Sequence, residues 1–165
     1  MADLLVRLYD LPPFEATARV AAAGVVVRRA LVPERQLILE WIGPRFSHYW
    51  VSEAATALSQ MPPSILIAVR NGMLLGFACY DTSAKGFFGP TGVDEASRGQ
   101  GIGEALLIAT LKAMREAGYG YAVIGDPGPV EFYKKRLDAL EIPGSEPGIY
   151  GGMLRAKTDP QEPLG

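Results

Sequence analysis

Blocks of apolar and polar residues alternate along this chain, and their spacing predicts both strands and helices. Short apolar runs rich in β-branched and aromatic residues predict strands, whereas apolar residues at helical spacing predict helices. The expected strands lie at 4–13, 25–31, 64–70, 73–80, 86–93 and 119–125. The expected helices lie at 14–23, 33–42, 52–60, 102–117 and 130–138.

Local signals set the start of two of these helices. Pro33 suits the first turn of a helix in which Leu37, Trp41 and Ile38 are expected to share one face. Ser52 is the expected N-cap of the next helix, because a serine side chain can accept a hydrogen bond from a free backbone N–H there. Two consecutive helices are therefore expected between the second and third strands.

The order of the later elements indicates the fold class. Asn71-Gly72 tolerates the positive φ angles of a two-residue hairpin turn, so the strands on either side of it should pair antiparallel. The strand at 86–93 extends this meander, and after it helices and strands alternate, as a parallel crossover requires. We therefore expect an α/β fold with a mixed sheet, antiparallel first and parallel later.

A glycine cluster, "ASRGQGIGEALLIA", stands where the strand at 86–93 leads into the helix at 102–117. The first turn of a helix has unpaired backbone N–H groups and the positive end of the helix dipole, so it attracts phosphate. Gly99, Gly101 and Gly103 would let a diphosphate approach the backbone, and Arg98 adds a forked cation. The pattern indicates a diphosphate-bearing ligand.

Two other phosphate motifs fit the cluster less well. A P-loop needs Lys and then Ser or Thr after the last glycine, whereas Gly103 is followed by Glu104 and Ala105. A dinucleotide fingerprint shares Gly99 and Gly101, and Asp126 could serve as its ribose-binding acid. However, Glu104 replaces its third glycine, and too little chain follows Asp126 to complete a doubly wound sheet.

The strand before the cluster, "GFFGPTGV", contains Pro90. Proline cannot donate a hydrogen bond to a neighbouring strand, so it marks a sheet edge or a bulge. Because this strand is expected to be central, part of its edge should be free to pair with an extended ligand that carries amides. An amide-bearing arm with a diphosphate at one end describes coenzyme A.

At this point the sequence resembles the GNAT acyltransferase superfamily. The family's phosphate motif is matched by Arg98, Gly101 and Gly103, within "GVDEASRGQGIGEALL". Glu95 stands where the family often has proline. The later segment "GPVEFYKKRLDA" resembles the family segment with a tyrosine, which places Tyr133 at that position.

The resemblance implies a mixed sheet whose two central parallel strands splay apart around acetyl-CoA, the acyl donor. It implies that the backbones of Gly92 and Val93 contact the pantetheine arm and the thioester, and that Tyr133 faces the sulfur. The diphosphate would be held by Arg98, Gly99, Gln100, Gly101, Ile102 and Gly103. The implied domain covers 25–157, after an N-terminal strand-helix extension at 1–24 and before a flexible tail at 158–165.

The implied reaction is attack of a primary amine of a small molecule or peptide on the thioester, within a ternary complex. A proton passing from tyrosine to a thiolate runs uphill by about 2 kcal/mol in reference pKa values, so Tyr133 is expected to act mainly as a hydrogen-bond donor. The general base is left open. The candidates are Glu95, Asp126, Glu131, Asp81 and His48, and a relay of water molecules could replace any single base.

The acceptor pocket is expected from three segments, 46–50, 52–60 and 143–153, whose composition does not identify the acceptor. Because the base is not evident, a non-catalytic acyl-CoA sensor is an alternative to an enzyme. An exposed sheet edge or the first strand could mediate a homodimer.

Composition limits the remaining possibilities. The 165 residues carry a net charge of −2, so a general nucleic-acid-binding surface is not expected. The apolar run near the N-terminus is too short for a membrane span and lacks the layout of a secretory signal. The single cysteine, Cys79, cannot form an internal disulfide. We expect a cytoplasmic protein with no metal site and no nucleic-acid or membrane partner.

Overall fold

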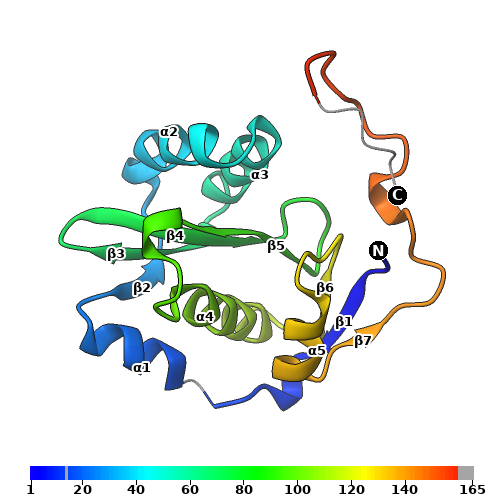
Figure 1. Cartoon of the computed structure of the whole chain (residues 1–165), viewed down its shortest axis with the longest axis horizontal. Helices are drawn as coiled ribbons and strands as arrows, with labels where there is room; N and C mark the ends of the chain where they lie inside the picture. Colours follow the sequence, from blue (N-terminus) through cyan, green and yellow to red (C-terminus); the bar gives the residue numbers. More distant parts are fainter. Residues whose placement is uncertain (14, 160–165) are drawn as a thin grey trace.

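Seven strands form one mixed sheet in the order β2-β3-β4-β5-β6-β1-β7 in the computed structural model, which describes residues 1–13 and 15–159 (Figure 1). The strands are β1 (Leu4–Arg7), β2 (Val26–Arg29), β3 (Ile65–Arg70), β4 (Met73–Tyr80), β5 (Phe87–Val93), β6 (Tyr121–Ile124) and β7 (Leu140–Glu141). The α-helices are α1 (Glu15–Ala22), α2 (Arg35–Arg45), α3 (His48–Leu58), α4 (Ile102–Glu116) and α5 (Val130–Leu137). The expected α/β class with a mixed sheet is confirmed.

Helices cover both faces of the sheet and give the molecule two hydrophobic cores (Figure 1). On one face, α4 packs with α1 and α5, and Leu106 and Leu111 of α4 are fully buried. On the other face, α2 and α3 cover Ile67 and Phe77 of the meander. Both cores bury side chains of β3 and β4, which fixes the meander between the two helical layers.

The meander and the parallel crossover have the expected directions. Strands β3, β4 and β5 pair antiparallel, and Asn71 (φ 51°) and Gly72 (φ 74°) make the hairpin turn between the first two. Strand β5 then pairs parallel to β6, and α4 lies between them in the chain, as a parallel crossover requires. The strand with Pro90 is therefore central, as predicted.

Two predicted helix details are wrong. The third helix begins at His48 rather than Ser52, because the Oγ of Ser47 accepts a hydrogen bond from the N–H of Trp50 at 3.3 Å and caps the helix earlier. In α2 the buried residues are Ile38 and Ile42, whereas Leu37 is 71% exposed. Ile38 and Trp41 of the predicted face do pack on the core, so only the position of Leu37 is wrong.

The N-terminal strand lies inside the sheet and not at its end. Strand β1 is shorter than the predicted 4–13, because a 3₁₀ helix, η1 (Leu8–Asp10), follows it. It pairs antiparallel with β6 on one side and with β7, which the sequence did not predict, on the other. The first residues of the chain thus contribute to the sheet next to β6.

Parts of two predicted segments fall outside the described residues. These are Phe14 of the helix expected at 14–23 and residues 160–165 of the tail expected at 158–165. Within residues 1–13 and 15–159, no helix combines the length and apolar character that a membrane crossing requires.

Candidate functional site

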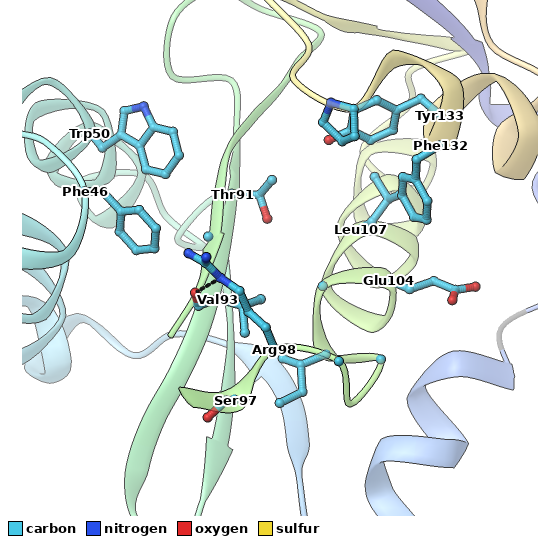
Figure 2. A pocket seen from close by; sticks show the side chains of 16 residues that line it. Phe46, Trp50, Thr91, Val93, Ser97, Arg98, Glu104, Leu107, Phe132 and Tyr133 are labelled. Carbon is cyan, nitrogen blue, oxygen red and sulfur yellow. Dashed lines mark hydrogen bonds between the residues drawn. The ribbon is translucent and has the colours of Figure 1, made fainter. Parts of the chain in front are cut away.

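A cavity of about 730 Å³ opens where β5 and β6 part (Figure 2). One wall carries the rings of Phe46 and Trp50, and Figure 2 shows the ring of Tyr133, from α5, on the opposite side. The floor is β5, and one end is closed by the turn that leads into α4. The lining residues are Phe46, Trp50, Thr91, Gly92, Val93, Ser97, Arg98, Gly99, Gly101, Ile102, Gly103, Glu104, Leu107, Pro129, Phe132 and Tyr133.

The cavity exists because the parallel pairing of β5 and β6 ends early. Within the described chain, β5 and β6 are paired only at Phe87 and Phe88, yet β5 continues to Val93. Gly89 and Pro90 together stand opposite Cys79 of β4, which is the bulge that the proline predicted. Beyond this bulge, one edge of β5 has no neighbouring strand among the residues that the structure describes.

The direction of the β5 amides follows from the pairing with β4. The N–H of Asp94 donates to the carbonyl oxygen of Leu75 on β4 at 2.8 Å. Because groups alternate sides along a strand, Thr91 and Val93 present their N–H and C=O groups to the cavity side. These two residues offer the edge that an extended ligand could pair with.

Arg98 lies across this edge. Its Nε donates to the carbonyl oxygen of Val93 at 3.3 Å, and Figure 2 shows the guanidinium beside β5. No hydrogen bond from its terminal nitrogens is found within residues 1–13 and 15–159. The side chain is exposed, so its remaining donors can reach a ligand in the cavity.

The glycine turn closes the cavity as a backbone cradle. Gly99 (φ +82°) and Gly101 (φ +80°) adopt left-handed conformations that glycine tolerates best, and Gly101 is the N-cap of α4. A Cβ on Gly99 would meet no atom within 4 Å, so the backbone there is open to a ligand. The first N–H groups of α4 are therefore placed where an anion could bind, at the end of the cavity.

The other two residues of the turn point elsewhere. The Oε1 of Gln100 accepts a hydrogen bond from Arg70 at 3.2 Å, on the exposed side of the turn. Ile102 is only 1% exposed and anchors the start of α4 in the core. They hold the turn in place, while their backbone groups remain part of the predicted cradle.

Gly92 is required by close packing. A Cβ there would lie 2.8 Å from Cε1 of Phe46, whose ring stacks on Trp50 with centroids 4.9 Å apart. Its carbonyl oxygen lies 2.9 Å from the position of a Cβ on Gly76, so it faces β4. Because Gly92 has no side chain, the ring of Phe46 can pack directly against it. The backbone groups that face the cavity are those of Thr91 and Val93.

Tyr133 contributes a buried ring to the wall opposite the two aromatic residues. It is 7% exposed, and burial raises the pKa of its hydroxyl above the ordinary value, because the phenolate would be poorly solvated. The ring contacts that of Phe132 edge-on, with centroids 5.5 Å apart. In the described part of the chain no hydrogen bond reaches its hydroxyl, which leaves it available to a ligand.

None of the five candidate bases lines the cavity as the structure describes it. Asp81 accepts hydrogen bonds from the hydroxyl of Tyr119 and the N–H of Gly86, and His48 is exposed with its Nε2 at 3.3 Å from Asp159. The other three, Glu95, Asp126 and Glu131, are exposed.

Several lining residues were not foreseen from the sequence, among them Thr91, Glu104, Leu107 and Phe132. Glu104 is an acid beside the anion cradle, but the Nε of Arg136 donates a hydrogen bond to it from α5. This pair offsets a charge that would otherwise repel phosphate. Nothing in the sequence pattern connects residues 104 and 136, because the contact depends on how α4 and α5 cross.

The arrangement fits a long ligand with an anionic end. The cradle could take a diphosphate, the free edge of β5 could pair with amides, and the aromatic wall could enclose an apolar group beside Tyr133. These are the recognition features of an acyl-coenzyme A. No group of three or more His, Cys, Asp or Glu residues arranged for a metal is found in residues 1–13 and 15–159.

Comparisons with known proteins agree with this geometry. The sequence model of the acetyltransferase (GNAT) family matches residues 35–138. None of the curated proteins matches the chain. A fungal GCN5-related glucosamine N-acetyltransferase region is 16% identical, with a TM-score of 0.70, and the match covers 86% of this chain and 19% of that one.

Two further structures share the fold. A GCN5-related N-acetyltransferase from Sphaerobacter thermophilus is 20% identical over 86% of this chain and 48% of that one, with a TM-score of 0.63. N-acetylglutamate synthase from Neisseria gonorrhoeae, solved with coenzyme A and N-acetylglutamate, is 18% identical over 68% of this chain and 27% of that one, with a TM-score of 0.50.

This chain spans about half or less of each of these three proteins. At such identities the likeness of these structures shows a shared fold. The match to the family model extends over more than half of the chain and includes β5, the glycine turn and Tyr133. The protein therefore belongs to the GNAT acetyltransferase family.

Proposed function

We propose that this protein is an N-acetyltransferase that moves an acetyl group from acetyl-CoA to a primary amine. The observation that carries the proposal is the free edge of β5 between its bulge and Val93, which ends at the glycine cradle. The family supports acyl transfer from an acyl-CoA to an amine. The acetyl group and the direct transfer in a ternary complex are the proposed refinements.

The cavity-side backbone of β5 would orient the donor. The amide arm of the acyl-CoA pairs with the edge formed by Thr91 and Val93, and its diphosphate binds the first N–H groups of α4. An edge N–H that points at the thioester oxygen stabilises the negative charge that grows there as the amine attacks. Holding both reactants together supplies most of the remaining rate enhancement.

Tyr133 would donate a hydrogen bond to the departing sulfur. The raised pKa of its hydroxyl makes full proton transfer to a thiolate even less favourable than the reference values suggest. A hydrogen bond requires no such transfer. The thiolate then takes its proton from water, and the proton released by the amine also leaves to water.

A second function, a non-catalytic acyl-CoA sensor, is favoured by one observation. None of the acids or the histidine proposed as bases lines the cavity in the described chain. A sensor would need only the site that binds the acyl-CoA and no path by which an acceptor amine could reach the thioester.

Thiol release from acetyl-CoA with a panel of primary amines, together with calorimetric titration of CoA, separates the two functions. An enzyme releases thiol only when an amine is present, and Tyr133→Phe lowers kcat by about tenfold or more while the Kd for CoA stays within about twofold. Tight CoA binding without turnover of any amine would favour the sensor. Absence of CoA binding by the folded protein would contradict both.

A further inference from the structure

At the end of the β5 edge opposite the glycine cradle lies a carboxylate, that of Glu53. Glu53 follows Trp50 by three residues on α3, so it lies on the same side of the helix as the aromatic wall. The Oγ1 of Thr82 lies 3.5 Å from its Oε1 and donates to the carbonyl oxygen of Gly89 at 3.1 Å. Glu53 is not among the residues that line the cavity, but Thr82 brings it close to Gly89, where the free edge begins.

Hydroxyl groups hold this carboxylate, and no cation does so in residues 1–13 and 15–159. Ser83 Oγ donates to its Oε1, and the hydroxyl of Tyr150 donates to Ser83 Oγ at 3.2 Å. Glu53 is only partly exposed, and its Oε2 has no hydrogen bond or ion pair within the described residues. A partly buried carboxylate without a cation is more stable when a ligand supplies one.

Tyr150 links Glu53 to β6, the strand across the gap from β5. Its ring lies 3.1 Å from the position of a Cβ on Gly125, directly after β6. Burial is the main cause of the raised pKa of Tyr150, and the charges of Glu53, Asp3 and Asp126 raise it further. Three acidic residues therefore lie around Tyr150 at this end of the gap between β5 and β6, although the N-terminal ammonium of Met1 lies near Asp3 and Asp126.

We propose that Glu53 determines acceptor specificity by receiving the cationic amine, whose apolar part lies along Trp50 and Phe46. The ammonium gives one proton to water before the neutral amine attacks the thioester. The inference rests on the proposed acyl transfer and names its acceptor class: primary amines on an apolar or aromatic group without a neighbouring carboxylate. Aromatic rings and an anion together attract such cations. An acceptor carboxylate would be repelled by Glu53 and its acidic neighbours.

The charge of the acceptor can be varied with little change in its shape. Phenethylamine and phenylalanine differ by one carboxylate, and both are tested at saturating acetyl-CoA. We expect kcat/KM for phenethylamine to exceed that for phenylalanine by about tenfold or more. We expect Glu53→Gln to raise KM for phenethylamine about tenfold, with kcat within about threefold, and to reduce the preference by a similar factor.

Two further variants accompany Glu53→Gln, one as a control at a distant acid and one as a second test of the site. Glu40→Gln removes an exposed acid on α2 that accepts a hydrogen bond from Gln36, and it should leave KM unchanged. Ser83→Ala keeps the charge of Glu53 but removes a hydroxyl that orients it, so KM should rise by about two- to threefold. If Glu53→Gln does not fold, a Ser83→Ala protein with unchanged KM would overturn the proposal.

A probe that cannot be acylated separates this inference from the proposed function. Phenethyltrimethylammonium is titrated calorimetrically into the protein–CoA complex. Binding that Glu53→Gln weakens about tenfold supports the inference even if no amine is turned over, in which case only the proposed enzymatic function fails. Equal binding to both proteins, no binding to the unsubstituted protein, or equal use of phenethylamine and phenylalanine would overturn the inference.

Discussion

The two ends of the free β5 edge are built in different ways. The proposed donor end comes from one continuous stretch, from Val93 through the turn to the start of α4, and it is made mainly of backbone groups. The acceptor end brings together α3, the β4–β5 loop and the C-terminal segment around Tyr150, and it is made of side chains. The difference suggests that the donor end is set by local backbone geometry, whereas the acceptor end depends on tertiary packing.

Loss of Phe77 should therefore affect the acceptor end most. Its fully buried ring contacts Trp41, Phe46 and Trp50 at centroid distances of 6.3, 5.9 and 6.0 Å. Phe77→Ala is expected to lower the free energy of unfolding by about 3–5 kcal/mol, measured by urea denaturation. At a temperature where the variant is folded, KM for amines should rise more than the Kd for CoA.

Leu106→Ala is the matched control on the other face of the sheet. Leu106 is fully buried, and we expect a loss of about 2–5 kcal/mol without a selective effect on amines. Equal changes in amine KM for the two variants would show that the acceptor end does not depend on the aromatic packing.

The donor end should respond to a single backbone change. Gly101→Ala puts a Cβ on a left-handed residue at the N-cap of α4, which costs about 1–2 kcal/mol in that conformation. If the backbone shifts to relieve this strain, the cradle is distorted. We expect the Kd for CoA to rise about tenfold, measured by calorimetry.

Gly118→Ala tests whether backbone strain at any glycine of this helix would by itself lower the affinity for CoA. Gly118 (φ +105°) follows the same helix at its other end, and a Cβ there would meet no atom within 4 Å. This variant should lose comparable stability and keep its CoA affinity. A similar loss of CoA affinity in both variants would argue against a cradle at Gly101.

The smallest effect on stability is expected from breaking the ion pair between Arg28 of the edge strand β2 and Glu34, away from both ends of the free β5 edge. Two nitrogens of Arg28 donate to Glu34 at 2.9 and 2.6 Å, and this pairing lowers the pKa of Glu34 below its ordinary value of 4.5. The stabilisation is therefore present above pH 4.5 and is lost as the pH falls through the lowered pKa. Glu34→Gln should cost less than about 1 kcal/mol at pH 7.

Urea denaturation at pH 7 and pH 3 checks this expectation. The difference between Glu34→Gln and the unsubstituted protein should shrink at the lower pH, and the CoA affinity should not change. A difference that grows as the pH falls would contradict the assignment.

The same contrast explains what could be predicted from the sequence. Left-handed turns need glycine and a proline interrupts a strand ladder, so Gly99, Gly101 and Pro90 could be interpreted from residue type alone. The mixed sheet was predicted from the Asn71-Gly72 turn and from the alternation of helices and strands after the meander. The fold and the family prediction are confirmed, whereas the roles of Tyr133 and of the cradle remain predictions.

What the sequence did not indicate depends on contacts between distant segments. Ser47 and Ser52 are both plausible caps, and in the structure Ser47 is the residue that caps the helix. Glu53, Ser83 and Tyr150 are unremarkable polar residues until the fold brings them together. Strand β7 forms because β1 offers it an edge, which no local pattern could show.

Amide hydrogen exchange with and without CoA tests the central claim most directly. The account predicts that the amides of Thr91 and Val93, and those of the first turn of α4, become strongly protected when CoA binds. The amides of α3 around Glu53 should change little, because CoA alone does not occupy the acceptor end. Binding of CoA without added protection at Thr91, Val93 and the α4 turn would contradict the account.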